Sequence, residues 1–478
     1  METIYWYDFE TFGRNPARDR LAQFAGLRTD YDLNPVGKPL VKYCKLTKDI
    51  VPEPGACLVT GITPQLANEK GLSEAKFTAA FYHEFVQPGT CIAGYNSINF
   101  DDEFTRHCLY RNFYNPYEHH SAKGNSRWDL LNVVRLFRAF HPDGDIIWPR
   151  KDCGKYSTKL EDLTQANGIE HDAHDALADV RATIALAKLL KNCNKRLFNY
   201  CFDNRLKGHC AEILGLERRR ISNPKPVLHF DSFYGSDNNY LAVILPVATH
   251  PSKSNSVLGF NLMTDPSPVL ELSARELRER LFKKKEEGDE ERIGLHEISI
   301  NKCPVIMPLD RVSKASCEKL GIDKKLCLER IQEIQSKDDV PYVVQASYSK
   351  SFPEKFDPEL KLYDGFLEKS DKKKCIEVRA TPPKSLGKID FDFSDPRLAT
   401  LLFRYRARNH PSTLTKEEQE IWDVYCKNRW RDHLDEGFLK VEDFNAQLEE
   451  LLQQDLSKDK MKVVKQLVNY GKATFEKA

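Results

Sequence analysis

The pattern of hydrophobic and polar positions in the first part of the chain switches between the period of a strand and the period of a helix. Residues 3–11, 39–46 and 91–95 are apolar runs or alternate apolar with polar side chains, which predicts three strands. Residues 73–86 predict a helix that begins at a possible serine cap. Because strands and helices follow one another, we predict an α/β domain over residues 1–192.

The middle of the chain has a different pattern, in which short β-type runs such as residues 240–245 are interrupted by prolines. Proline is confined to the edges and ends of strands, so this stretch predicts a small β-rich domain over residues 193–350. The interrupting prolines are Pro224, Pro226, Pro246, Pro251, Pro266 and Pro268.

The last part of the chain, residues 351–478, has a helical pattern. Asp395 and Pro396 form a cap followed by a first helical residue, and apolar residues then recur at helical spacing. Thr415 and Glu418 have the spacing of a capping box at the start of a further helix. We therefore predict an all-α domain here.

Length and composition fit a soluble protein of about three domains, with 478 residues, 41% hydrophobic and 30% charged. The sequence has no apolar stretch that could span a bilayer and no signal segment, so we expect a cytoplasmic protein without membrane contact. The 13 cysteines include no Cys-x-x-Cys pair, which favours reduced, mostly buried thiols. Since the net charge is +1, a local basic surface must hold any polyanion.

The first strand carries two carboxylates, Asp8 and Glu10, two residues apart. Side chains on a strand alternate faces, so these acids should point the same way while Phe9 points into the core. Neighbouring acids on a buried-type strand repel each other, and a bound cation would compensate for that repulsion. The alternative is a strand that runs out into solvent, where neighbouring acids cost little.

A third acid, Asp101, is expected in the first turn of a helix, because apolar residues recur at helical spacing from Phe100 onward. An aspartate that only caps the helix is the simpler alternative. Further along, the apolar stripe of a long helix places Asp179 on that helix and His174 just before it. The five-residue step lets the imidazole reach over a metal held by the carboxylate, although a surface cap is again the simpler alternative.

Two stretches combine basic residues in a way that suits nucleic acid. Residues 148–156 form a basic, aromatic loop, and rings interleaved with cations suit unpaired bases and their phosphates. An ordinary solvated loop is the alternative. Arg404, Arg406 and Arg408 could face a phosphate backbone, and surface solvation is an equally good interpretation.

Taken in order, the candidates give Asp-x-Glu, then an aspartate at a helix start, then His-x-x-x-x-Asp. This order resembles the DEDD superfamily of 3′→5′ exonucleases, in the subclass with a histidine at the fifth position. The resemblance covers roughly the first 190 residues. It implies an α/β, ribonuclease H-like fold with a mixed central sheet, and it implies that the catalytic residues are Asp8, Glu10, Asp101, His174 and Asp179.

Downstream, residues 241–251, 300–305 and 403–409 resemble the exodeoxyribonuclease I family of bacteria over nearly the whole chain. The resemblance implies that the β-rich domain is SH3-like and that the protein degrades single-stranded DNA from its 3′ end to 5′-mononucleotides, in DNA repair and recombination. It also implies that a single-stranded DNA-binding protein docks through its acidic tail. We expect a monomer.

Four carboxylates in one pocket need divalent ions to neutralise them, and oxygen ligands suit Mg²⁺ or Mn²⁺. The resemblance implies two Mg²⁺ ions, for which Mn²⁺ could substitute. Asp8 would bridge both, Glu10 and Asp179 would hold the water-bearing ion, and Asp101 would support the other. His174 would take the proton from the attacking water, a role that a near-neutral pKa suits.

Two other functions remain open. An RNA or oligonucleotide exonuclease with the same five residues would resemble only the first domain, whereas here two further domains could extend a single-strand channel. A catalytically inactive scaffold that binds nucleic acid would not need to keep all five residues. A metal-dependence assay on labelled oligonucleotides separates these possibilities.

Overall fold

The computed structural model describes residues 2–172, 175–283, 293–349, 354–431 and 437–475 of the chain. The chain forms two compact units. Unit 1 contains Met1–Ser126, His171–Ile184 and Glu354–Ala478, and unit 2 contains Arg127–Glu170 and Ala185–Pro353. The predicted boundaries after residues 192 and 350 divide the chain in sequence order, and they stay a prediction beside these spatial units.

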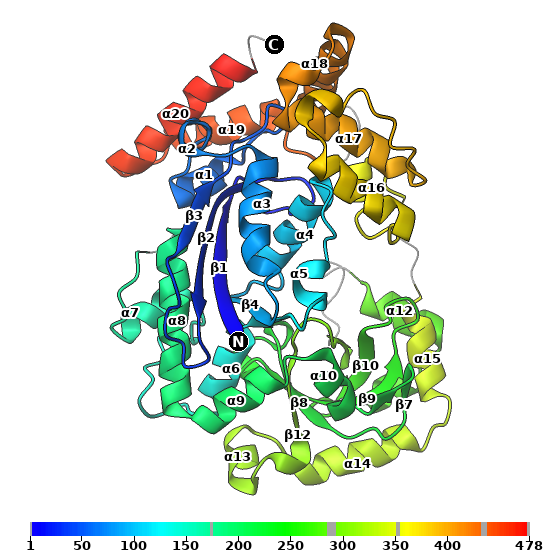
Figure 1. Cartoon of the computed structure of the whole chain (residues 1–478). Coiled ribbons are helices and arrows are strands. Elements are labelled where there is room, and N and C mark those ends of the chain that lie inside the picture. The colour runs from blue at the N-terminus through cyan, green and yellow to red at the C-terminus, as the bar shows by residue number, and fades with distance from the viewer. Residues whose placement is uncertain (1, 173–174, 284–292, 350–353, 432–436, 476–478) are drawn as a thin grey trace. The chain divides into compact units, whose positions relative to one another are not determined.

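A five-stranded sheet with the order β3-β2-β1-β4-β5 organises unit 1, and the unit boundary falls after the first residue of β5. β1 lies in the middle of this sheet and pairs antiparallel with β2 and parallel with β4 (Figure 1). The sheet is therefore mixed, as predicted. Its strands are β1 (Thr3–Thr11), β2 (Leu21–Thr29), β3 (Leu40–Tyr43), β4 (Thr90–Gly94) and β5 (Ser126–Asp129).

The aromatic residues of β1 bury one face of this sheet. The ring of Phe9 lies 5.2 Å from that of Phe24 on β2 and 5.5 Å from that of Phe81, measured between centroids. Phe81 belongs to α3 (Glu74–Phe85), the helix predicted over residues 73–86, although the Ser73 side chain makes no capping hydrogen bond. Because strand side chains alternate, the acids of β1 lie on the opposite face from Phe9, as predicted.

The other helices in the N-terminal half of unit 1 are short, and one long helix continues across the unit boundary. They are α1 (Pro54–Thr60), α2 (Pro64–Lys70), α4 (Asp101–Arg111), α5 (Glu118–Ser121) and the long α8 (Ala176–Cys193). Two of the short ones begin with proline, whose missing N–H costs nothing at a helix start. At α2 the Thr63 hydroxyl accepts a hydrogen bond from the Leu66 backbone N–H over 3.3 Å, which fixes where this helix begins.

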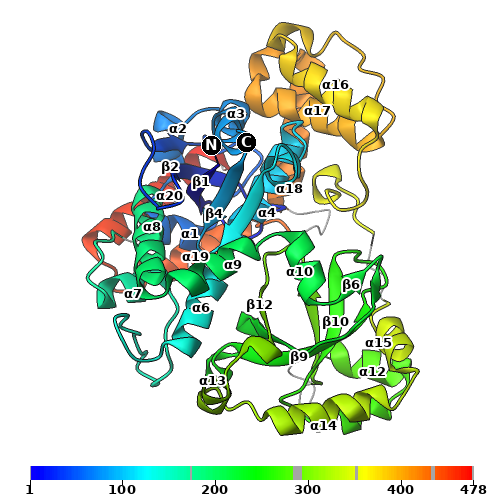
Figure 2. The same ribbon diagram turned by 60° about the horizontal axis from the view of Figure 1, so that its bottom comes forward.

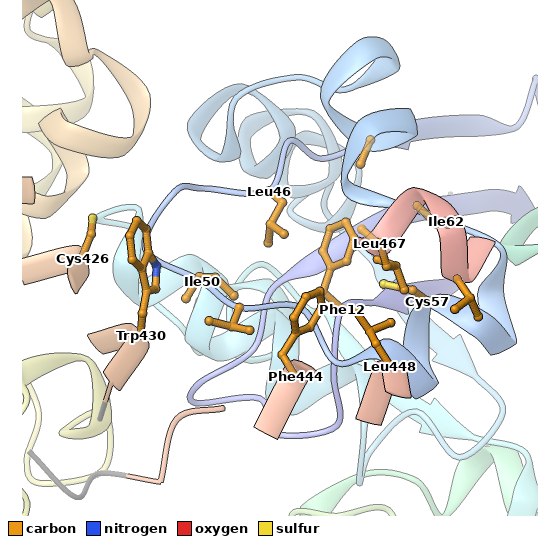
Figure 3. Packing of buried hydrophobic residues seen from close by; sticks show 14 of the residues in the cluster. Phe12, Leu46, Ile50, Cys57, Ile62, Cys426, Trp430, Phe444, Leu448 and Leu467 are labelled. Atoms are coloured by element: carbon orange, nitrogen blue, oxygen red, sulfur yellow. The ribbon is translucent and has the colours of Figure 1, made fainter. Parts of the chain in front are cut away.

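The C-terminal helices of unit 1 share a hydrophobic core with the N-terminal residues. Phe12, which directly follows β1, packs with Phe444, Leu448 and Leu467 in one buried cluster (Figure 3). The end of the strand that carries the two acids is therefore covered by the last helices of the chain. The C-terminal helices are α16 (Lys369–Ala380), α17 (Pro396–Asn409), α18 (Lys416–Arg431), α19 (Val441–Leu452) and α20 (Lys458–Thr474).

A buried network of arginines and carboxylates joins the same two parts of unit 1. Glu359, which is fully buried, accepts hydrogen bonds from Arg20 at 2.9 Å, from Arg404 at 3.1 Å and from Arg408 at 2.6 Å. Asp49, also fully buried, accepts a further hydrogen bond from Arg408 at 2.8 Å. Charges that are buried in this way need partners, and here the protein supplies them.

This network corrects the sequence-based interpretation of the three arginines on α17. Arg404 and Arg408 neither face a phosphate backbone nor lie in solvent, because both are buried against Glu359. Arg406 is buried too and pairs with Glu418 at 2.6 Å. The prediction was wrong because the carboxylate partners of Arg404 and Arg408 lie outside the helix, where no local pattern reveals them.

Unit 2 is built on a second five-stranded sheet, with the order β11-β10-β9-β8-β12 and antiparallel neighbours (Figure 2). The predicted β-rich character of the middle segment is therefore confirmed. The strands of this unit are β6 (Leu216–Glu217), β7 (Arg220–Ile221), β8 (Val227–Phe230), β9 (Leu241–Thr249), β10 (Ser256–Asn261), β11 (Leu295–Ser299) and β12 (Val305–Pro308). Its helices are α6 (Leu131–Phe140), α7 (Leu160–Ala166), α9 (Lys195–Asp203), α10 (Lys207–Ile213), α11 (Ser267–Leu270), α12 (Ala274–Leu281), α13 (Lys314–Lys319), α14 (Lys324–Gln335) and α15 (Val340–Ser347).

The sequence predicted no membrane-spanning segment and reduced cysteines. Within the described ranges, no helix combines the length and the apolar character that a membrane crossing requires. The cysteines are free thiols, and most of them are buried, as predicted, with Cys153 exposed and Cys193 half-buried. Burial raises the pKa of a thiol such as Cys327 to about 11, so the buried thiols stay protonated and unreactive at neutral pH.

Candidate active site

The first two candidate residues lie on β1, as the sequence predicted. Asp8 pairs in register with Ala25 of β2, and Glu10 pairs with Gln23. Glu10 is buried and Asp8 is half-buried, on the face of the sheet opposite the aromatic cluster. The register between β1 and β2 shifts just after Glu10, so the two acids occupy the last regular positions of the strand.

Asp101 is the first residue of α4, which also agrees with the sequence-based prediction. Its Oδ1 accepts a hydrogen bond from the backbone N–H of Phe9 over 3.1 Å. Phe9 is the residue between the two acids of β1, so this bond brings the third carboxylate next to both of them. Asp101 is 4% exposed, and its burial shows that it does more than cap a helix in solvent.

Asp179 lies in the first turn of α8, as predicted. Its carboxylate contacts the Nε2 atom of His171. Asp175, four residues earlier, accepts a hydrogen bond from the Ala178 backbone N–H at 2.9 Å and so stabilises the start of the helix. His174 lies outside the described residues, so its predicted catalytic role stays a prediction.

The structure brings the carboxylates of different segments together. Oxygen atoms of Asp8, Glu10 and Asp179 all lie within 4.8 Å of one another, a grouping that could hold a metal ion. Asp101 joins them through its hydrogen bond to β1. Four acids from three separate segments of the chain therefore surround one site.

The electrostatics of this carboxylate cluster favour the binding of a cation. Burial, followed by repulsion from Asp101, Glu10 and Asp179, raises the pKa of Asp8 well above its usual value. Burial, followed by repulsion from Asp179 and Asp101, raises the pKa of Glu10 to about 9. Within the part of the chain that the structure describes, neither Asp8 nor Glu10 forms an ion pair with lysine or arginine. Oxygen ligands without a protein counter-charge fit divalent ions such as Mg²⁺.

A second group of possible ligands lies next to Asp101 and has a different character. Asp102, His119 and His120 also bring ligand atoms within 4.8 Å of one another. Here, however, Arg106 supplies the positive charge, because its guanidinium lies 3.0 Å from Asp102 and 3.5 Å from the Nε2 atom of His120. This group lies beside the site, and the protein itself supplies the positive charge that balances its carboxylate. No motif in the sequence indicated it, because the two histidines follow the aspartate at no recognisable spacing.

Three protein-family models match consecutive parts of the chain. Residues 5–187 match the exonuclease model, residues 207–350 match the exonuclease I SH3-like domain, and residues 356–474 match the exonuclease I C-terminal domain. The predicted fold class is therefore confirmed: an α/β, ribonuclease H-like exonuclease domain is followed by an SH3-like domain and a helical C-terminal domain.

Proteins of known identity resemble the chain over its whole length. Exodeoxyribonuclease I of Haemophilus influenzae is 40% identical and that of Escherichia coli is 41% identical, and in each comparison 98% of both chains is covered. Exonuclease I from Methylocaldum szegediense has a solved structure with a TM-score of 0.93 and 44% identity, covering 99% of this chain and 100% of that chain. The crystal structure of E. coli exonuclease I in complex with a dA16 oligonucleotide has a TM-score of 0.92 and 40% identity, with the same coverage. The chain belongs to the exodeoxyribonuclease I family.

Proposed function

We propose that this protein is a 3′→5′ exodeoxyribonuclease that degrades single-stranded DNA to 5′-mononucleotides. The observation that carries this function is the convergence of Asp8, Glu10, Asp101 and Asp179, with no lysine or arginine of the described ranges paired to the two acids of β1. Family membership supports the substrate, since the E. coli relative has been solved with a single-stranded oligonucleotide.

The carboxylates fit two Mg²⁺ ions, for which Mn²⁺ could substitute. Asp8 would contact both ions, Glu10 and Asp179 would hold one, and Asp101 would hold the other. Bound ions of this kind stabilise the attacking and leaving oxygens of a phosphodiester displacement. A zinc-bound form of the E. coli exonuclease I–DNA complex supports a divalent metal in the family.

His174 is proposed as the general base that takes the proton from the attacking water. The two histidines near Asp179 have separate roles in this proposal. His171 already contacts the carboxylate of Asp179, so its imidazole orients a metal ligand. His174 is left to move the proton, and a near-neutral pKa suits that role.

The experiment that tests this function is a cleavage assay of the full chain on 3′- and 5′-labelled oligonucleotides. Single-stranded DNA should be shortened from its 3′ end in Mg²⁺ and left intact in EDTA. Faster cleavage of RNA than of DNA would favour an RNA exonuclease instead. Metal-independent binding without cleavage would favour an inactive scaffold.

We further propose that the protein acts as a cytoplasmic monomer in DNA repair and recombination and that it binds the acidic tail of a single-stranded DNA-binding protein. The support for the last point is a solved complex of exonuclease I with such a protein. A fluorescent acidic-tail peptide should bind the full chain, and its binding should weaken with salt. Light scattering of the same sample gives the oligomeric state.

A further inference from the structure

The basic, aromatic loop that the sequence singled out forms a small hairpin in unit 2. Arg150 and Tyr156 face each other in an antiparallel bridge, and the Lys151 N–H donates to the Lys155 carbonyl over 2.8 Å. The Arg150 guanidinium also donates to the Gly154 carbonyl over 2.9 Å and to the Tyr156 hydroxyl. These bonds hold the hairpin, residues 149–157, in one conformation.

The ring of Tyr156 is stacked against two guanidinium groups. The Cζ atom of Arg138, on α6, lies 3.6 Å from the ring centroid, and that of Arg150 lies 4.0 Å from it. Both guanidinium groups therefore lie against the same ring. We call this arrangement, Arg138–Tyr156–Arg150, the guanidinium sandwich. The stacking role that the sequence suggested for rings in this loop stays a prediction.

The positive charge of the sandwich is not neutralised by the protein. In the described ranges, neither Arg138 nor Arg150 forms an ion pair, and the exposed Lys151 beside them forms none either. Arg138 donates to the amide oxygen of Asn239, which carries no charge. Asp152, in the turn of the hairpin, is exposed, and Asp237 pairs with Lys155 at 2.7 Å.

The exposed Arg275 has a different arrangement. Arg275, also in unit 2, pairs with Glu279 at 3.0 Å on the next helical turn. A surface arginine in a purely solvating role is commonly paired in this way or is left free to move. In the sandwich, two like charges instead lie close together against a neutral ring, and no carboxylate of the described residues pairs with them.

We propose that the guanidinium sandwich, together with Lys151, binds phosphate groups of the single-stranded DNA backbone outside the active site. The inference rests on the proposed DNA substrate. A guanidinium presents a planar set of donors that matches two phosphate oxygens, and stacking on a ring fixes its orientation in advance. Since the net charge of the whole chain is only +1, a local cluster of this kind is what can attract a polyanion.

The test measures binding of a fluorescent oligo(dT) to the full chain in EDTA, so that no cleavage occurs, at several salt concentrations. Arg150→Ala should weaken binding by roughly 3- to 10-fold, and Arg150→Ala with Lys151→Ala should weaken it further. The slope of log affinity against log salt should fall by about 0.7 for each phosphate that the variant no longer neutralises. Arg275→Ala, which removes an exposed but already paired cation, is the matched control and should change neither quantity. Circular dichroism and thermal unfolding of each variant check that the fold is preserved.

The outcomes separate this inference from the proposed function. If the parent protein fails to bind single-stranded DNA, the proposed function is wrong. If the parent binds and Arg150→Ala with Lys151→Ala has the same affinity and salt slope as Arg275→Ala, the inference is overturned. It is also overturned if the double variant loses affinity for an acidic peptide while keeping its affinity for DNA, because the sandwich would then be a protein-docking surface.

Discussion

Unit 1 contains two buried clusters of charged side chains, and the pKa values of their carboxylates shift in opposite directions. In the arginine network, burial alone would raise the pKa of Glu359, but Arg408, Arg20 and their neighbours hold it well below its usual value. In the active-site cluster, burial and then repulsion from the neighbouring acids together raise the pKa of Glu10 to about 9. The arginine network is the more completely buried of the two, and among the described residues the clusters differ in whether the protein provides counter-charges.

This difference distinguishes a structural cluster from a candidate metal site. A buried carboxylate that is surrounded by guanidinium groups is already satisfied and links parts of the fold. A buried carboxylate that is surrounded by other acids is destabilising until an external cation arrives, and that feature is typical of functional sites. The Asp102–His119–His120 group fits the first class, because Arg106 lies among its members.

The sharpest test of the comparison replaces one acid in the active-site cluster. Asp8→Asn should abolish hydrolysis, because it removes the proposed ligand shared by both ions. The same change should raise the melting temperature of the metal-free protein, because asparagine neither carries a charge that Glu10, Asp101 and Asp179 repel nor needs to take up a proton on folding. Labelled-oligonucleotide cleavage and thermal unfolding in EDTA check both results. Normal turnover by this variant in Mg²⁺ would contradict the assignment of Asp8.

A second test separates the proposed base from the proposed ligands. His174→Ala should lower the cleavage rate by about 10² to 10⁴, the usual contribution of a positioned proton acceptor. Its metal affinity, measured by calorimetry, should change little, because the carboxylates are the ligands. His171→Ala is the control, and we expect a smaller loss of rate from it. A larger loss from His171→Ala than from His174→Ala would mean that the two histidines have been assigned the wrong way round.

A third test breaks the structural cluster. Glu359→Gln should lower the free energy of unfolding by roughly 3–5 kcal/mol, because it leaves buried guanidinium groups without their common partner. Chemical denaturation measures this change. The exposed ion pair Arg275–Glu279 gives the matched control, since Glu279→Gln should lower the free energy of unfolding by no more than about 1 kcal/mol. Equal effects of the two substitutions would show that the network does not stabilise the fold.

The smallest expected effect is on the pH dependence of stability, which should differ between the two clusters. Because the pKa of Glu10 is raised from 4.5 to about 9, the metal-free native state holds a proton that the unfolded state has lost between these values. Stability of the metal-free protein should therefore fall as pH rises through this window. Glu359, with a lowered pKa, contributes stability that is present above its unfolded pKa and is lost on acidification.

Melting temperatures from pH 5 to pH 9, with and without Mg²⁺, check this dependence. Added Mg²⁺ should raise the melting temperature more at pH 9 than at pH 6, because the ion takes the place of the proton on the clustered acids. A gain that is independent of pH would contradict a metal site at Glu10.

Much of the active-site cluster could be predicted from the sequence, because each of its parts obeys a local rule. The period of two along β1 placed Asp8 and Glu10 on one face, and the helical pattern after Phe100 placed Asp101 at a helix start. The apolar stripe of α8 placed Asp179 on that helix. The family resemblance then supplied what periodicity could not, namely that these segments meet.

The arginine network could not be predicted, because its pairs join residues that are far apart in the chain. Arg408 and Asp49 are separated by 359 positions, and nothing in the pattern around either residue indicates the other. The guanidinium sandwich could not be predicted either, although its residues lie closer together in the sequence. The sequence indicated a basic, aromatic loop, but it could not show that Arg138 on a neighbouring helix would cover the ring of Tyr156.

The shared core of Phe12, Phe444, Leu448 and Leu467 has a consequence for how the protein is made (Figure 3). A ribosome adds about 5–20 residues per second, so roughly 20 to 90 s pass between the synthesis of Phe12 and that of its partners on α19 and α20. During this time the end of β1 lacks the side chains that bury it in the finished protein. The core that covers the end of β1 is therefore complete only after the last helices have left the ribosome.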